Sequence, residues 1–286
     1  MPHKILWFFM GSILHRVTFI FTGAYMTPEL LPVLAEAAKL PELLKEIYGD
    51  LAKPGVVQVG KALSSVFGLG NTILWPVQLL NERVRIALEA NLERYRQKLA
   101  DIPPEKIVPV PPEVGVPIAE KLAYIQDVEL KELYLNLLAK GSILESQSQA
   151  HPSFVNVINN LSPDEGVLLK QFKAAPQPFV FARLSNPATN YWMEIVEMSF
   201  PILPAIHLAF PQNLVAYVSN LEGLGLVKVI RNEQVVPESV YLPMEEAIRT
   251  LYKDITPIPE YPELTCSRGR INVTSFGRLF LNACVE

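Results

Sequence analysis

The amino-acid sequence predicts a mainly α protein, in which a helical hairpin or bundle is followed by a small α+β domain of winged-helix-like type. Apolar residues recur at helical spacing through the first half, a helix-start signal occurs at Ser162, and strand-like runs alternate with short helices after it. The length of 286 residues allows two domains. We therefore expect a hydrophobic leader over residues 1–25, a helical domain over 26–162 and the winged-helix-like domain over 163–286.

The leader allows three interpretations. Residues 5–14 are an unbroken apolar or small run, which His15 and Arg16 interrupt before a second apolar stretch. A membrane-spanning helix would place Arg16 near its centre, at a cost of about 2.5–3.5 kcal/mol. The second interpretation is an ordinary buried helix, and the third is a leader that is not part of the working protein. In the last case the native start is Met26, because an ordinary soluble sequence follows it.

The first predicted helices form a hairpin. Residues 27–50 have a helical pattern that prolines cut into short pieces. A helix over 56–67 and a helix over 72–100 flank a glycine-containing turn. Their apolar stripes are Val56, Val59, Leu63 and Val66 in the first helix, and Leu80, Val84, Leu88, Leu92, Tyr95 and Leu99 in the second.

A proline-rich stretch follows the hairpin. Six prolines lie within residues 103–117, so we expect an extended or turn-like chain there. Its Ile and Val residues indicate that it packs along a groove. We predict a helix over 117–142 and a short helix from His151 to Ile158.

The second predicted domain begins at a capping box. Ser162 suits the N-cap, Pro163 suits the first helical position, and Glu165 completes the box of a helix that runs to about residue 173. The following elements are strands at 179–181 and 191–200, a helix at 211–224, a strand at 227–230, a helix at 244–252, a strand at 271–273, and a last helix capped by Thr274 or Ser275. This order favours a winged-helix-like domain.

The charge of the chain argues against nucleic-acid binding. The net charge is −4, and the predicted recognition helix, residues 212–225, contains no Lys or Arg. Phosphate contacts require cations. Apolar residues make up 50% of the chain and charged residues only 19%, which favours a protein partner or self-association and leaves a membrane contact open.

No motif of catalysis, metal binding or nucleotide binding is present. The histidines form no metal spacing, no GxSxG surrounds Ser153, and no P-loop occurs. We interpret His151 as a structural cap or packing residue. Cys266 and Cys284 form no CxxC pair. We therefore predict a protein that is not an enzyme, with no catalytic, cofactor-binding or metal-binding residues, no cofactor and no evident small-molecule substrate.

The apolar hairpin over 54–80 has one unusual feature. Gly60, Ser64 and Gly68 recur every four residues, a pattern that permits close approach of helices. The hairpin therefore has a membrane-inserting interpretation. Lys61 argues against a clean span, and a hairpin in a water-soluble core is favoured.

Four stretches resemble the abortive infection alpha family of bacterial domains. They are IYGDLAKPGVVQVGKALSSVFGLGNTILWPVQLLNERVR, IPPEKIVPVPPEVGVPIAEKLAY, ELYLNLLAKGSI and HPSFVNVINNLSPDE. The resemblance covers residues 47–169 closely and extends more loosely to the end. It implies phage defence, in which an infected cell stops growing or dies, and it supplies no catalytic residues.

The expected function is therefore anti-phage defence of the abortive-infection type, through protein–protein interaction without catalysis. One alternative is a membrane-perturbing effector that uses the 54–80 hairpin, and a second is a winged-helix transcriptional regulator. We expect a cytoplasmic protein, with inner-membrane association through residues 1–25 as the alternative.

Overall fold

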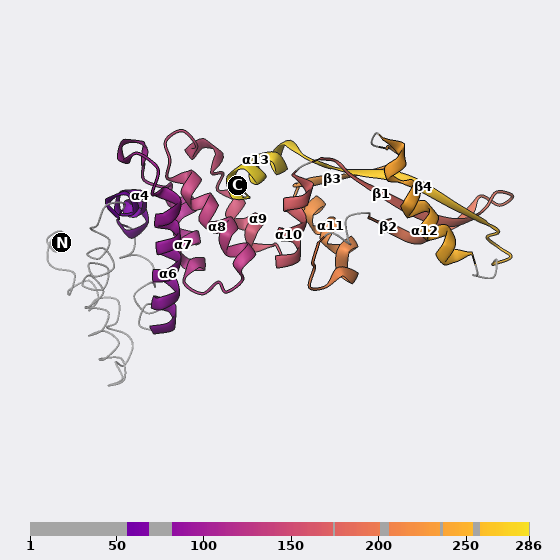
Figure 1. The fold of residues 1–286 in the computed structure, drawn as a ribbon, viewed down its shortest axis with the longest axis horizontal. Coiled ribbons are helices and arrows are strands. Elements are labelled where there is room, and N and C mark those ends of the chain that lie inside the picture. The colour runs from indigo at the N-terminus through magenta and orange to yellow at the C-terminus, as the bar shows by residue number, and fades with distance from the viewer. Residues whose placement is uncertain are drawn as a thin grey trace, which may run out of the picture.

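The computed structural model describes residues 56–68, 82–173, 175–200, 206–234, 237–253 and 258–285. Figure 1 shows a helical body, from which a long sheet with one attached helix extends; we call this extension the sheet arm. The predicted leader, the proline-cut segment over 27–50 and the turn of the hairpin lie outside the described residues.

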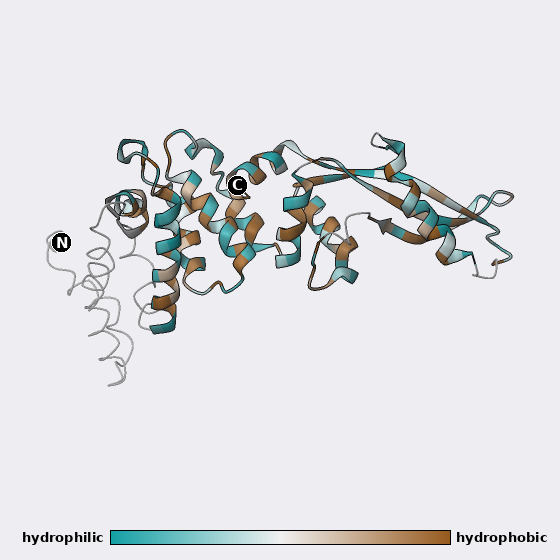
Figure 2. Ribbon diagram, in the orientation of Figure 1, coloured by the Kyte–Doolittle hydropathy of each residue, from teal (hydrophilic) through white to brown (hydrophobic). Residues whose placement is uncertain are grey.

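The helical body contains the elements that the apolar stripes predict. Its helices are α4 (Val56–Gly68), α6 (Glu82–Leu99), α7 (Pro112–Leu122), α8 (Val128–Gly141), α9 (Ser153–Asn159) and α10 (Pro163–Phe172). The predicted stripe residues that are buried are Val59, Leu63 and Val66 in α4, and Leu88, Leu92, Tyr95 and Leu99 in α6. Figure 2 shows hydrophilic and hydrophobic bands alternating along the helices, as expected where each buries one face.

The proline-rich stretch corrects the sequence prediction. Its first part packs as expected, with Ile107 and Val110 fully buried. However, α7 begins at Pro112 and contains Pro117, where we expected an extended chain up to residue 117. The predicted single helix over 117–142 is also wrong, because Asp127 starts a new helix by accepting a hydrogen bond from the Leu130 N–H at 2.9 Å.

The arm is a four-stranded antiparallel sheet. Its strands are β1 (Gln177–Asn186), β2 (Tyr191–Ser199), β3 (Val227–Arg231) and β4 (Glu263–Val273), in the order β2-β1-β4-β3. β1 and β4 pair along nine positions, from Gln177 opposite Ile271 to Ser185 opposite Glu263. β4 is much longer than the predicted strand at 271–273. β2 carries two register shifts against β1, between Val180 and Arg183.

The remaining helices begin and end close to the predicted residues. They are α11 (Leu214–Gly223), α12 (Leu242–Tyr252) and α13 (Ser275–Cys284). Thr274 caps α13 by accepting a hydrogen bond from the Gly277 N–H at 2.8 Å. α11 ends in a Schellman turn, in which the Leu226 N–H bonds the Leu221 carbonyl and Gly225 adopts a φ of 74°.

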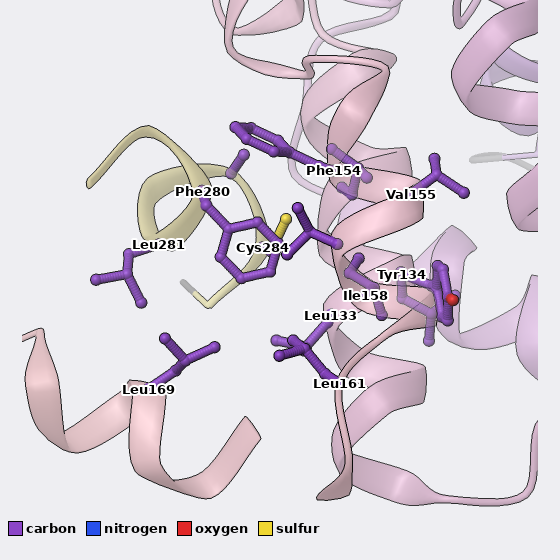
Figure 3. Close-up of a cluster of buried hydrophobic side chains, with 14 of the residues drawn as sticks. Leu133, Tyr134, Phe154, Val155, Ile158, Leu161, Leu169, Phe280, Leu281 and Cys284 are labelled. Atoms are coloured by element: carbon purple, nitrogen blue, oxygen red, sulfur yellow. The ribbon is translucent and has the colours of Figure 1, made fainter. Parts of the chain in front are cut away.

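One apolar core joins the body to the base of the sheet. It contains Leu133, Phe154 and Leu169 from the body together with Phe280 and Leu281, so α13 packs against helices of the body. Figure 3 shows Phe280, Leu281 and Cys284 of α13 facing these helices. The core therefore continues across residue 162, while the division into domains at that position stays a prediction.

A smaller core lies further out on the arm. Val180 and Ala182 of β1 pack against Tyr241, Met244 and Ile248, so α12 covers one face of the sheet. The predicted combination of many helices with a small α+β part is confirmed.

Candidate binding surface on the sheet arm

The histidine that the sequence draws attention to has a structural position. His151 Nδ1 accepts a hydrogen bond from the N–H of Ser153, the first residue of α9, at 3.1 Å. Its ring lies 5.6 Å from the Phe154 ring and 6.2 Å from the Phe276 ring, measured between centroids. His151 therefore links α9 to α13 by packing.

The two cysteines are both free. Cys284 is buried in the core, and this burial raises the pKa of its thiol well above the ordinary value. Burial also raises the pKa of Cys266 on β4. Over the described ranges, no three His, Cys, Asp or Glu side chains gather closely enough to hold a metal ion.

The carboxylates that follow Ser162 form a buried joint. Ser162 and Glu165 make both hydrogen bonds of the predicted capping box. Asp164 accepts hydrogen bonds from the Ala209 N–H at 2.8 Å, the Phe210 N–H at 2.9 Å and the Tyr217 hydroxyl at 2.9 Å.

These hydrogen bonds control the ionisation of Asp164. Burial opposes the charged carboxylate, but the three donors outweigh burial and lower the pKa of Asp164 below its ordinary value. The charge therefore stabilises the joint between α10, α11 and the segment before α11.

Neighbouring asparagines complete the joint. The Asn220 side chain donates to the Asn160 carbonyl at 2.9 Å and to Glu165 at 2.8 Å. Asn159 accepts a hydrogen bond from the Tyr134 hydroxyl at 2.8 Å. These polar residues of the stretch HPSFVNVINNLSPDE thus connect helices.

The sheet arm presents a different arrangement on the face that α12 does not cover. There the Arg183 guanidinium lies 5.1 Å from the centroid of the Trp192 ring and 5.8 Å from that of Phe181. Arg231, from the opposite edge strand, lies 4.7 Å from the Phe181 centroid. Trp192 is 56% exposed, whereas Phe181 is buried beneath the two arginines. We call Phe181, Arg183, Trp192, Glu194 and Arg231 the arginine–tryptophan surface.

The two arginines of this surface differ in their partners. Arg231 forms a bidentate pair with Glu194, at 2.6 Å and 3.2 Å. This pair raises the pKa of Arg231. The Arg183 side chain makes no hydrogen bond or ion pair with another described residue; its contacts are the two aromatic rings. Its donors are therefore available to a ligand.

Sequence reasoning missed this surface. Tyr191 and Trp192 follow a four-residue turn in which Asn190 has a φ of 60°, a conformation that asparagine tolerates. A turn followed directly by two aromatic residues was the available signal. Which face they occupy depends on the position of α12, which the sequence pattern does not give.

Comparison with known proteins places the chain in a family. The sequence model of the abortive infection alpha family matches residues 87–284, more than half of the chain. The chain belongs to the abortive infection alpha family. This confirms the resemblance found in the sequence. The match runs from α6 of this abortive infection alpha protein to the end of α13, and so includes the sheet arm.

Other comparisons add little. No curated protein matches the chain. An uncharacterized protein from the hydrocarbon-degrading marine bacterium Alcanivorax borkumensis SK2 is similar at 14% identity and a TM-score of 0.31. The match covers 49% of this chain and 96% of that chain. Within the described part of this abortive infection alpha protein, every helix is too short or too polar to cross a membrane.

Proposed function

We propose that this protein acts in anti-phage defence of the abortive-infection type, in the cytoplasm, by binding a protein partner and without catalysis. Its membership of the abortive infection alpha family carries the proposal. The use of Asp164, Glu165 and His151 in joints and caps supports a non-catalytic role, because these side chains are already engaged within the fold.

The shape of the molecule supports binding. The arm extends from the helical body, and its uncovered face carries an exposed tryptophan beside an arginine without an anionic partner. Tryptophan and arginine are the side chains most enriched at the energetic centres of protein interfaces. We also propose that residues 163–286 form a winged-helix-like module that binds a protein, since α11 carries no Lys or Arg for contacts with nucleic acid.

The described half of the 54–80 hairpin supports this proposal over membrane insertion. In α4, the apolar side chains of Val59, Leu63 and Val66 are buried in the core of the body. The Ser65 hydroxyl also donates to the Val110 carbonyl at 2.5 Å. Exposing this helix to lipid would break up a packed core.

Phage plating tests the proposal. The gene is expressed in a bacterium that lacks it, and the efficiency of plating is measured against a broad phage panel. We expect plating to fall for at least one phage, and the infected cells to stop growing before the phage is released. Unchanged plating across the panel contradicts the proposal. Leakage from dye-loaded liposomes on addition of the protein would favour the membrane-perturbing alternative instead.

A further inference from the structure

We propose that the arginine–tryptophan surface binds an acidic segment of a partner protein, with a carboxylate on Arg183 and an apolar or aromatic side chain on Trp192. This inference rests on the proposed function, because it specifies the chemistry of the partner that the arm recognises. It starts from the contrast between Arg183 and the other arginines of the sheet.

Those other arginines are already neutralised. Arg231 pairs with Glu194, Arg270 pairs with Glu233 at 2.6 Å, and Arg268 pairs with Glu245 at 2.6 Å. Arg268 also contacts Glu238. Among the strand arginines that the structure describes, Arg183 alone has ring contacts and no carboxylate. A ligand that brings one carboxylate completes the same pattern.

The geometry of Arg183 leaves its donors accessible. A guanidinium that stacks over aromatic rings keeps its N–H groups around its rim, where they match the two oxygens of a carboxylate. Phe181 and Trp192 hold the group from β1 and β2 respectively. The ion pair of Arg231 with Glu194 holds the side of the surface toward β3. Arg183 is therefore held in place before a ligand arrives.

Trp192 supplies the apolar half of the site. The residue is more than half exposed, although one side of the indole contacts Arg183. Ser185 lies directly opposite Trp192 on β1, so a small side chain leaves space beside the ring. An apolar or aromatic side chain of the partner buries area there, next to the carboxylate site.

The charge of the surface distinguishes a peptide from the other polyanions. Grooves that bind single-stranded nucleic acid follow the backbone with several cations, and anionic membranes attract clusters of basic residues. Here the carboxylates of Glu194 and Glu197 both act on Arg231, which leaves Arg183 as the arginine of the surface without a carboxylate partner. One cation beside one aromatic ring fits one carboxylate beside one apolar group.

A peptide titration of the full-length protein tests this. The probe is a fluorescein-labelled peptide of repeated Tyr-Ser-Glu-Ser units, in which Tyr and Glu fall on the same side of an extended chain. Matched peptides replace Glu by Gln, Glu by Lys, or Tyr by Ser. Oligothymidylate and phosphatidylglycerol vesicles are titrated in parallel.

We expect saturable binding of the Tyr-Ser-Glu-Ser peptide, at least about tenfold weaker for each matched peptide and for the Arg183→Gln and Trp192→Ala variants. Arg183→Lys is expected to bind more weakly than the wild type, because an ammonium lacks the planar pair of donors. The controls are Arg249→Gln, which removes an exposed charge from α12, and Tyr124→Ala, which removes an exposed aromatic ring from the body. Both should bind within about twofold of the wild type.

The inference is overturned if the glutamate and glutamine peptides bind equally, if Arg183→Gln binds like the wild type, or if the wild type does not bind. Preferential binding of oligothymidylate or of vesicles also overturns it, in favour of those ligand classes. Phage plating reports separately on the proposed function. A protein that binds the peptide but does not restrict phage contradicts only the proposed function, and a protein that restricts phage without binding the peptide contradicts only this inference.

Discussion

At the scale of single residues, one position shows why a glycine is required where a helix approaches backbone. A Cβ atom on Gly277 would lie 1.9 Å from the Leu226 carbonyl oxygen. That carbonyl accepts a hydrogen bond from the Thr274 N–H at 3.0 Å, so it is held in place. The first turn of α13 can approach β3 this closely only with glycine.

Replacing this glycine should therefore be costly. We expect Gly277→Ala to lower the free energy of unfolding by about 2–3 kcal/mol, because the backbone has to move to relieve the overlap. Gly223→Ala is the matched control, since a Cβ at Gly223 meets nothing within 4 Å. Urea denaturation followed by circular dichroism measures both. Equal stability of the two variants would contradict the packing argument.

The Asp164 joint gives a second prediction at this scale. Asp164→Asn places an amide opposite three hydrogen-bond donors, so we expect a loss of about 1–3 kcal/mol in the free energy of unfolding. Tyr217→Phe removes only one of these donors and should cost about 1 kcal/mol. A larger loss in Tyr217→Phe than in Asp164→Asn would contradict this account.

The pH dependence of this joint follows from the lowered pKa of Asp164. The folded state favours the ionised carboxylate, so the stabilisation is complete above the unfolded pKa of about 4 and is lost as the pH falls through the lower folded pKa. Wild-type stability should thus decrease on acidification more steeply than that of Asp164→Asn. Thermal unfolding between neutral pH and pH 2 tests this difference.

At the scale of elements, α13 links the C-terminal part of the described chain to the helices of the body. Phe280 is fully buried and its ring meets that of Phe154 edge-on, 5.3 Å between centroids. The Asn136 side chain donates to the Cys284 carbonyl at 2.8 Å, and so satisfies the C-terminal turn of α13.

We expect Phe280→Ala to destabilise the protein by about 3–5 kcal/mol, because it leaves a cavity between α13 and α9. Asn282→Ala, on the exposed side of the same helix, should change stability by less than about 0.5 kcal/mol. Chemical denaturation compares the two variants. If the variant lowered the stability of the sheet arm, followed by Trp192 fluorescence, but not that of the helices, α13 would stabilise the sheet rather than the body.

The elements also show where sequence reasoning succeeds and fails. The capping box at Ser162 depends on local contacts and is confirmed, and so is the part of the α6 stripe from Leu88 to Leu99. Val84 of that stripe is only partly buried, and Leu80 lies outside the described residues. The position of Pro117 inside α7 was not predicted, because a proline within a helix costs about 3 kcal/mol. Burial of the helix face that carries Val114 and Ile118 offsets this cost. Residues 263–270 of β4 were missed because Arg268 and Arg270 interrupt its apolar pattern.

The arginine–tryptophan surface could not be predicted, because it depends on which face of the sheet a helix covers. A strand places alternate side chains on opposite faces, but the sequence does not say which face a helix will cover. Here α12 packs on Val180 and Ala182, and this leaves Arg183 and Trp192 on the uncovered face. The alternation of side chains along the strand could be predicted from the sequence. The position of the helix that covers the sheet depends on tertiary packing and could not.

At the scale of the whole molecule, the arm depends on the body for stability. Among the residues that the structure describes, the smaller core under α12 contains five buried side chains, too few for a stable domain of its own, whereas the larger core reaches from α4 to α13. We expect a single cooperative transition in urea. In a Trp7→Phe and Trp75→Phe background, the fluorescence of Trp192 reports on the arm, and circular dichroism reports on the helices.

The two signals should change at the same urea concentration. If the Trp192 signal changes at a lower urea concentration, the arm unfolds independently of the body. This result would support the predicted division into two domains at residue 162. Arg183→Gln serves as the control, because it keeps Trp192 as the reporter and should leave the helical transition nearly unchanged.

The hydrogen bond between Asn136 and Cys284 joins residues 148 positions apart. During folding, α8 can therefore acquire this neighbour only after the whole intervening sheet has brought α13 back to it. Closing so large a loop costs entropy before any contact is gained, and it slows the search for the native state. The newly made helices thus have an exposed apolar face until the last strand is in register, and this interval is when a chaperone would be needed.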